Sequence, residues 1–234
     1  MLIRSLVAEA FATNCYVVAP EAGAECVVVD PGIGVVPGLD EVLAEHRLKP
    51  VAVLMTHGHL DHTFSVTPVC GARDIPAYIH AGDRELLADP MKGLSPQLGA
   101  IFGGRLTWTE PDDVAILPDG GDLRLAGLEF TVDHAPGHTP GSVLFRLPGD
   151  DDAAAYCLSG DVLFAGSIGR TDLPGGSTEA MMTSLRDKIL PLADETEVLP
   201  GHGGATTIGR ERRTNPFLRQ VNESGHMRAP TRGM

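Results

Sequence analysis

Residues 51–62 read VAVLMTHGHLDH, and this stretch decides how the rest of the chain is interpreted. Its first five residues predict a buried strand, and that strand is followed at once by His57, His59, Asp61 and His62. Neutral imidazole and carboxylate are the ligands that Zn²⁺ and Fe²⁺ favour. Because side chains alternate in extended backbone, His57 and His59 point the same way, while Asp61 and His62 open the next element toward a neighbouring point. A lone Asp61 would suit a helix N-cap, but the four residues together indicate ligands for two adjacent metal ions.

Three later segments each place one ligand-type residue where an apolar run meets a turn. They are APGHTPGS around His138, LSGD ending on Asp161, and LPGHGG around His202. Taken alone, each segment is typical of an ordinary Gly/Pro turn. Their order after the first cluster favours a shared binuclear site.

These motifs resemble those of the metallo-β-lactamase superfamily over almost the whole chain. Within it, GSIGRTDLPGG (166–176) and ERRTNPFL (211–218) resemble the short bacterial glyoxalase II-like proteins, which are similar to hydroxyacylglutathione hydrolase. The resemblance implies two divalent metal ions per chain, with zinc favoured over iron or manganese. Carried over residue by residue, it implies these ligands: His57, His59 and His138 for one ion, Asp61, His62 and His202 for the other, and Asp161 bridging both.

The fold implied by this resemblance is an α+β sandwich of αββα type, with two facing mixed β-sheets and helices outside. The hydrophobic pattern agrees with this fold. A run of short strands bounded by Gly, Pro and Asn is followed by a helix, and this order occurs twice along the chain. The expected strands cover 2–8, 14–19, 25–30, 51–55, 77–80, 122–126, 128–133, 142–147, 154–159 and 196–199, and the expected helices 39–47, 61 onward, 82–88, 177–190 and 209–218. We expect one domain over residues 1–218 and a frayed tail over 219–234. The long irregular segment 89–112 is typical of a functional loop.

Composition limits the classes of binding partner and the cellular compartment that we expect. The net charge of −13 argues against nucleic acid, because neutralising phosphates requires clustered Lys and Arg. No apolar run approaches the ~20 residues of a membrane span, and residues 1–5 lack the apolar core of a signal peptide. Cys15, Cys26, Cys70 and Cys157 form no C-x-x-C pair, so reduced thiols are expected rather than a disulfide framework. We therefore expect a cytoplasmic protein that binds neither nucleic acid nor membrane.

The implied ligand set predicts hydrolytic chemistry. Two metal ions roughly 3.5–4 Å apart share a hydroxide at neutral pH, and Asp61 and Asp161 act in catalysis through that hydroxide. As the only anionic ligands they leave the site with net positive charge, which stabilises the oxyanion formed when hydroxide attacks a carbonyl. A thiolate leaves readily, so a thioester needs little general-acid help. The resemblance thus implies a thioester hydrolase that converts S-D-lactoylglutathione, or a related small-molecule thiol ester, to a hydroxy acid and a free thiol.

Two features separate the chain from longer glyoxalase II enzymes. Too few residues follow His202 for the C-terminal helical region that helps those enzymes bind glutathione, and Arg170 stands where they carry a lysine. Arg170 is expected to bind a substrate carboxylate, and an ion pair with Asp172 is an equally good interpretation. Asp30, at a strand end, is expected to orient a metal-bound histidine. His134, four residues before His138, is expected to be a buried structural histidine, and support of a metal-binding residue is the alternative.

Three other functions stay open from the sequence. A persulfide dioxygenase-like oxidoreductase with one iron shares the His-x-His-x-Asp-His cluster and a Gly-Arg-Thr-Asp stretch, but the intact motif at His202 favours hydrolysis. A lactonase or β-lactamase would use the same two metals, and the Gly-Arg-Thr-Asp stretch disfavours it. A non-catalytic metal-binding module would fit better if one of the ligands were missing.

Overall fold

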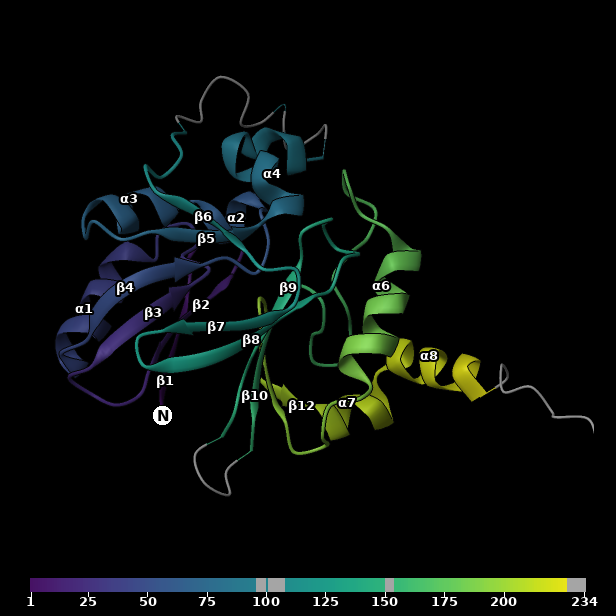
Figure 1. Cartoon of the computed structure of the whole chain (residues 1–234). Coiled ribbons are helices and arrows are strands. Elements are labelled where there is room, and N and C mark those ends of the chain that lie inside the picture. Colours follow the sequence, from purple (N-terminus) through teal and green to yellow (C-terminus); the bar gives the residue numbers. More distant parts are fainter. Residues whose placement is uncertain (96–99, 101–107, 150–153, 227–234) are drawn as a thin grey trace, which may run out of the picture.

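The computed structural model describes residues 1–95, 100, 108–149 and 154–226, which form two facing β-sheets with helices on their outer sides (Figure 1). The first sheet contains, in spatial order, β1 (Leu2–Val7), β2 (Asn14–Ala19), β3 (Glu25–Val29), β4 (Lys49–Leu54), β5 (Ala77–His80) and β6 (Val114–Leu117). The second contains β12 (Thr206–Thr207), β11 (Glu197–Pro200), β10 (Tyr156–Gly160), β9 (Val143–Leu147), β8 (Leu128–His134) and β7 (Gly121–Leu125). Both sheets are mixed, because β3 to β6 and the pair β10/β11 are parallel while the other neighbours are antiparallel.

The helices fall into two groups, one for each sheet (Figure 1). The N-terminal group contains α1 (Val36–His46), α2 (Leu60–Thr63), α3 (Val66–Gly71) and α4 (Arg84–Ala88), with the 3₁₀ turns η1 (Ala81–Asp83) and η2 (Pro90–Gly93). The C-terminal group contains α6 (Thr178–Ser184), its π-helical continuation η3 (Leu185–Ile189), α7 (Ile208–Thr214) and α8 (Pro216–His226). The predicted αββα sandwich is confirmed. None of the helices in the described part of the chain has the length and hydrophobicity that crossing a membrane requires.

The core is layered, and the layers explain why the central strands are almost wholly apolar. In β4, Val53 belongs to the cluster under the first helices, whereas Leu54 belongs to the cluster between the sheets, which also contains Phe130 of β8. In β9, Leu144 faces the third cluster with Met181 of α6. A strand buried on both faces reads as a continuous hydrophobic run rather than an alternating one.

The strand directions bring the ligand motifs to one edge of the sandwich. The carboxyl ends of parallel strands meet at one edge, so the segments after β3 and β4 are neighbours. The segments after β10 and β11 are neighbours for the same reason. Strand β8 runs in the same direction as β10, because two antiparallel pairings separate them. The amide of Val143 donates to the carbonyl of Thr56 at 2.8 Å, which ties the two sheets together at this edge.

Some expectations need correction. Strands β6 and β12 were not predicted; both are short edge strands whose hydrogen bonds come from their neighbours. The prediction of a frayed tail is wrong for residues 219–226, because α8 runs to His226 and Val221 is buried in the third cluster. Residues 227–234 lie outside the described part, as do 96–99 and 101–107 of the expected loop 89–112.

The four cysteines all lie in the described part, as buried free thiols. Burial raises the pKa of Cys26, Cys70 and Cys157 to about 12, and that of Cys15 well above its usual range. The reactive thiolate is therefore scarce at pH 8 and hidden from reagent. We expect the native protein to show no fast-reacting thiol toward a chromogenic disulfide reagent, and four after unfolding in guanidinium. A rapidly titrating thiol in the native protein would contradict this burial.

Candidate metal centre

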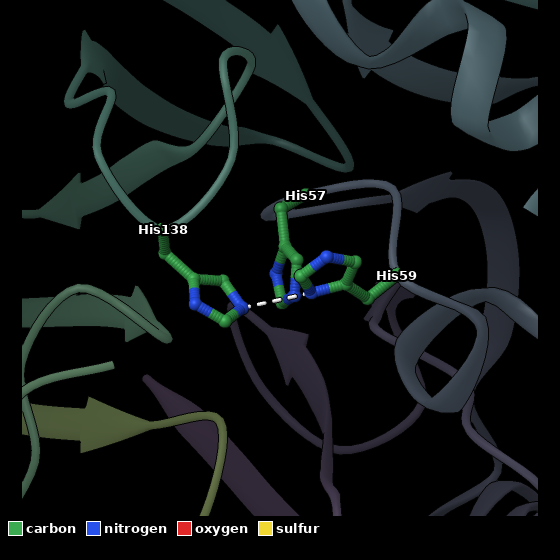
Figure 2. A group of neighbouring side chains, drawn as sticks. All are labelled: His57, His59 and His138. Atoms are coloured by element: carbon green, nitrogen blue, oxygen red, sulfur yellow. Dashed lines mark hydrogen bonds between the residues drawn. The ribbon is translucent and has the colours of Figure 1, made fainter. Parts of the chain in front are cut away.

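Three buried imidazoles from two loops converge at this edge (Figure 2). His57 and His59 follow β4, and His138 comes from the loop after β8. His59 Nδ1 lies 2.8 Å from His138 Nε2, and the candidate ligand atoms of all three residues lie within 4.8 Å of one another. His138 Nδ1 donates to the carbonyl oxygen of Arg170 at 2.7 Å, which leaves Nε2 facing the cluster. The structure thus brings together the three residues predicted for the first metal.

The second predicted set is also brought together, nearer the surface. His202 Nε2 lies 3.2 Å from His62 Nε2 and 3.2 Å from Asp61 Oδ2. His62 Nε2 lies 3.6 Å from the same Asp61 oxygen. His62 is buried, whereas Asp61 and His202 are half-buried, so this cluster meets the solvent on one side.

Asp161 lies between the two clusters. Its Oδ2 is 3.5 Å from His138 Nε2 in the first cluster and 3.5 Å from His202 Nε2 in the second. Its Oδ1 is 3.3 Å from His62 Nε2. A carboxylate that reaches both clusters equally is in the position that a bridging ligand requires.

The donor set fits a pair of metal ions. With Zn–N distances of 2.0–2.1 Å, two ligands of one tetrahedral ion lie about 3.4 Å apart, and the separations above run from 2.8 to 3.6 Å. His57 Nε2, His59 Nε2 and Asp161 Oδ1 are buried atoms with no hydrogen-bond partner among the described residues. Because an unpartnered buried polar atom is costly, these atoms favour a bound cation. The buried clusters are consistent with a binuclear metal site.

The electrostatics differ between the two clusters: the imidazole pKa values fall for His57 and His59 in the first cluster and rise for His62 and His202 in the second, beside the carboxylates. Burial, with His138 as a further cause, lowers the pKa of His59 to about 3, and burial also lowers the pKa of His57 well below its usual range. Burial alone would raise the pKa of Asp161, but the charge of His62 outweighs it and the net direction is downward. The same balance lowers the pKa of Asp61. The first cluster therefore presents the imidazole lone pairs of His57 and His59 to a cation near neutral pH, and Asp61 and Asp161 present ionised carboxylates.

Residues behind the ligands hold their orientation. Asp30 Oδ2 lies 3.0 Å from His62 Nδ1, and Oδ1 accepts from the Thr56 amide at 2.8 Å. The structure therefore places Asp30 where it can orient a metal-binding histidine, as expected. His202 Nδ1 donates to the carbonyl of Phe11 at 3.1 Å. Phe11 has a φ of 64°, a left-handed conformation that is rare for a bulky residue and costs free energy.

Asp83 is the supporting residue that sequence reasoning missed. It is fully buried, and its carboxylate accepts from Gly58 N at 2.8 Å, from Thr139 Oγ1 at 2.6 Å and from Gly141 N at 2.6 Å. It thus joins the loop of His57 to the loop of His138. The available signal was its position just after β5, a strand whose end lies at the same edge as that of β4.

Two other predicted residues lie outside the ligand clusters. His134 stacks on His80 with ring centroids 4.1 Å apart, and its Nε2 donates to the carbonyl of Pro140 at 2.8 Å. Its side chain is 27% exposed, so the expectation of a buried histidine is wrong. Arg170 borders the cavity beside the clusters, and its Nε and Nη2 donate to the two oxygens of Asp172, each at 2.7 Å. Arg170 therefore lies at the cavity, as substrate binding requires, and also forms the ion pair with Asp172.

Gly201 provides a test of the geometry around Asp161. A Cβ at this position would collide with Asp161 Oδ1 and lie 2.6 Å from His62 Cε1. Since neither side chain can yield without moving a ligand, Gly201→Ala is expected to lower metal content below two per chain and activity by ~10–100-fold. Gly204→Ala in the same loop is the matched control, because its Cβ would meet nothing within 4 Å. Metal analysis of both variants checks this, and a Gly201→Ala protein with two tightly held metals would contradict the site geometry.

A cavity of about 460 Å³ opens beside the clusters. Ligand residues form its floor, among them His59, Asp61 and His202. Its walls come from the β1–β2 loop, the segment after η2 and the segment after β10. A cavity of this size suits a small-molecule substrate.

Comparison with known proteins agrees with the architecture and the ligand set. The model of the metallo-beta-lactamase superfamily matches residues 8–202. An uncharacterized protein of Mycobacterium tuberculosis is 46% identical over 220 residues, which cover 93% of this chain and 98% of the relative. The probable metallo-hydrolase YqgX of Bacillus subtilis is 39% identical over 83% of this chain and 87% of its own. Hydroxyacylglutathione hydrolase GloC of Haemophilus influenzae is 34% identical over 93% of this chain and 98% of its own.

Solved structures give the same result. The crystal structure of BLEG-1 B3 metallo-beta-lactamase superimposes with a TM-score of 0.80 at 38% identity, covering 93% of this chain and 99% of that one. The di-iron-bound form of TTHA1623 superimposes with a TM-score of 0.75 at 39% identity, covering 92% and 100%. With the αββα sandwich and the paired His/Asp clusters, these matches show that the chain belongs to the metallo-beta-lactamase superfamily and is a metal-dependent hydrolase of that family.

Proposed function

We propose that the protein is a binuclear metal-dependent hydrolase of thioesters, similar to glyoxalase II, acting on a small-molecule substrate in the cytoplasm. The position of Asp161 carries the proposal, because its Oδ2 lies equally close to both histidine clusters and the second cluster is complete. The likeness to hydroxyacylglutathione hydrolase GloC supports the thioester, S-D-lactoylglutathione being the reference substrate. Zinc is the metal we propose, and a di-iron centre is known in the similar protein TTHA1623.

The protein's own residues would do three things. His57, His59 and His138 would hold one ion, Asp61, His62 and His202 the other, and Asp161 would bridge them. When bound, two such ions supply Lewis acidity and a water of lowered pKa. The half-buried faces of Asp61 and His202 then leave an opening through which a carbonyl substrate in the cavity reaches the centre.

A β-lactam substrate is the second candidate. It is favoured by one observation, the 38% identity with BLEG-1, which is described as a B3 metallo-beta-lactamase. The same two ions would serve an amide carbonyl, although an amine is a poorer leaving group than a thiolate. A mononuclear oxidoreductase acting on persulfides fits less well, because His202 stands beside Asp61 and His62 and completes a second cluster.

One experiment separates these functions. The purified protein is analysed for bound metals and assayed for thiol release from S-D-lactoylglutathione and from an N-acetylcysteamine thioester, for nitrocefin cleavage, and for oxygen uptake with a persulfide. We expect about two metal ions per chain, thiol release and no oxygen uptake. One tightly bound iron with oxygen consumption, or nitrocefin cleavage without any thiol release, would overturn the proposal.

A further inference from the structure

The walls of the cavity are apolar, although its floor is built from charged ligands. Phe11, Leu94, Phe164, Ile168 and Leu173 line it on several sides. The ring of Phe164 meets His202 edge-on at a centroid distance of 6.0 Å, so the apolar wall begins at the second ligand cluster. A substrate carbonyl at the centre therefore has hydrophobic surface immediately beside it.

The rim of the cavity carries no unbalanced positive charge among the described lining residues. Arg170 is the one Lys or Arg there, and two of its N–H groups bind both oxygens of Asp172. Exposed ion pairs are weak, but Asp172 is only two residues away and cannot leave, so its negative charge offsets the guanidinium even when the pair opens. The donors that remain on Arg170 suit an uncharged carbonyl or amide oxygen better than a carboxylate.

Phe11 is exposed apolar surface that the core does not explain. Half of its surface is open, and its left-handed backbone aims the ring at the cavity while its carbonyl accepts from His202. A strained bulky residue persists only when its surroundings hold it in place. Its ring and its carbonyl thus join the apolar wall to the second ligand cluster.

From these features we infer that the cavity selects a neutral thioester with an apolar acyl group, rather than a thioester of a charged thiol such as glutathione. This inference rests on the proposed thioester hydrolysis and names its substrate class. Phe11 and Phe164 hold the acyl group, and Asp172 is the specificity residue that cancels the charge of Arg170.

Binding of uncleavable probes to the metal-loaded protein tests the inference without turnover. The probes are ketone thioethers with a methylene between carbonyl and sulfur: S-phenacyl-N-acetylcysteamine, S-acetonyl-N-acetylcysteamine and S-phenacylglutathione. We expect calorimetry to show the neutral aromatic probe binding roughly tenfold or more tightly than either of the others, because phenyl burial adds apolar area and glutathione brings uncompensated charge. Equal affinity for phenacyl and acetonyl probes, or tighter binding of the glutathione probe, would overturn the inference.

Two variants with matched controls assign the residues. Phe11→Ala is expected to lower the affinity for the neutral phenacyl probe about five- to tenfold with metal content unchanged. Val7 is an exposed apolar residue outside this cavity, and Val7→Ala is expected to leave that affinity unchanged.

Asp172→Asn is expected to raise the affinity for the glutathione probe several-fold, because it frees Arg170. Asp187→Asn removes the same charge from the similar pair with Arg186 elsewhere and is expected to have no such effect. If Asp187→Asn matches Asp172→Asn, net charge rather than the rim sets selectivity and the inference fails.

Failure of the inference and failure of the proposed function are distinguishable. Thiol release that is faster from S-D-lactoylglutathione than from a phenylacetyl thioester of N-acetylcysteamine would leave thioester hydrolysis standing and overturn the selectivity. Tight binding of the neutral aromatic probe with no thiol release from any thioester would overturn the hydrolysis and retain an apolar, uncharged cavity.

Discussion

Asp161→Ala is expected to remove nearly all hydrolytic activity and at least one of two bound metal ions. Its carboxylate reaches both histidine clusters through one oxygen, with Oδ2 at 3.5 Å from His138 Nε2 and from His202 Nε2. A metal centre contributes several kcal/mol of transition-state stabilisation. Because each 1.36 kcal/mol is tenfold in rate, we expect kcat/KM to fall by about 10³-fold or more. Metal analysis and a thiol-release assay measure the two effects.

A second variant shows which of the two metal sites is lost. His202→Ala is expected to empty mainly the second site, because His202 approaches Asp61 and His62, whereas the first site keeps His57, His59 and His138. Circular dichroism on both variants shows whether the fold is retained. An Asp161→Ala protein with two metals and full turnover would show that the bridging assignment is wrong.

Asp83→Ala is expected to lower both the stability of the protein and the metal affinity of the first site. Three donors, from Gly58, Thr139 and Gly141, converge on this buried carboxylate, and truncation leaves them unpaired. The free energy of unfolding should fall by ~2–5 kcal/mol. Because those donors hold the loop of His138 against that of His57, metal affinity should fall by ~10–100-fold, as is usual for residues that support ligands. Denaturant unfolding and metal titration are the measurements.

The control for Asp83 is another aspartate that accepts a backbone hydrogen bond. Asp89 accepts from Met91 N at 3.2 Å at the start of η2, but it is exposed. Asp89→Ala should cost about 1 kcal/mol and leave metal affinity unchanged. If Asp83→Ala behaves like Asp89→Ala, the buried carboxylate does not couple the two loops.

The sequence predicted the parts of this site that depend on local geometry. The pattern around His57 and His59 indicated one strand end with ligands on alternate positions, and the Gly/Pro turns at His138 and His202 marked further strand ends. Apolar runs such as 51–55 indicated strands, and the structure shows that β4 is covered on both faces. The same reasoning failed for β6 and β12, which have four and two residues, because periodicity is not visible over so short a stretch.

Only the tertiary structure decided how these segments meet. The contacts of Asp83 with Gly141 and of His202 with Phe11 join residues 58 and 191 positions apart, so they depend on sheet order and loop paths rather than on any local period. Sequence alone also did not decide the charge at the cavity rim, although the two residues involved are close together in the chain. Sequence left Arg170 free to bind a substrate carboxylate or to pair with Asp172, and the folded loop places both oxygens of Asp172 against its guanidinium. Residue types and their order therefore determined which chemistry is available, and the packing of distant loops determined the geometry and charge of the surface that a substrate meets.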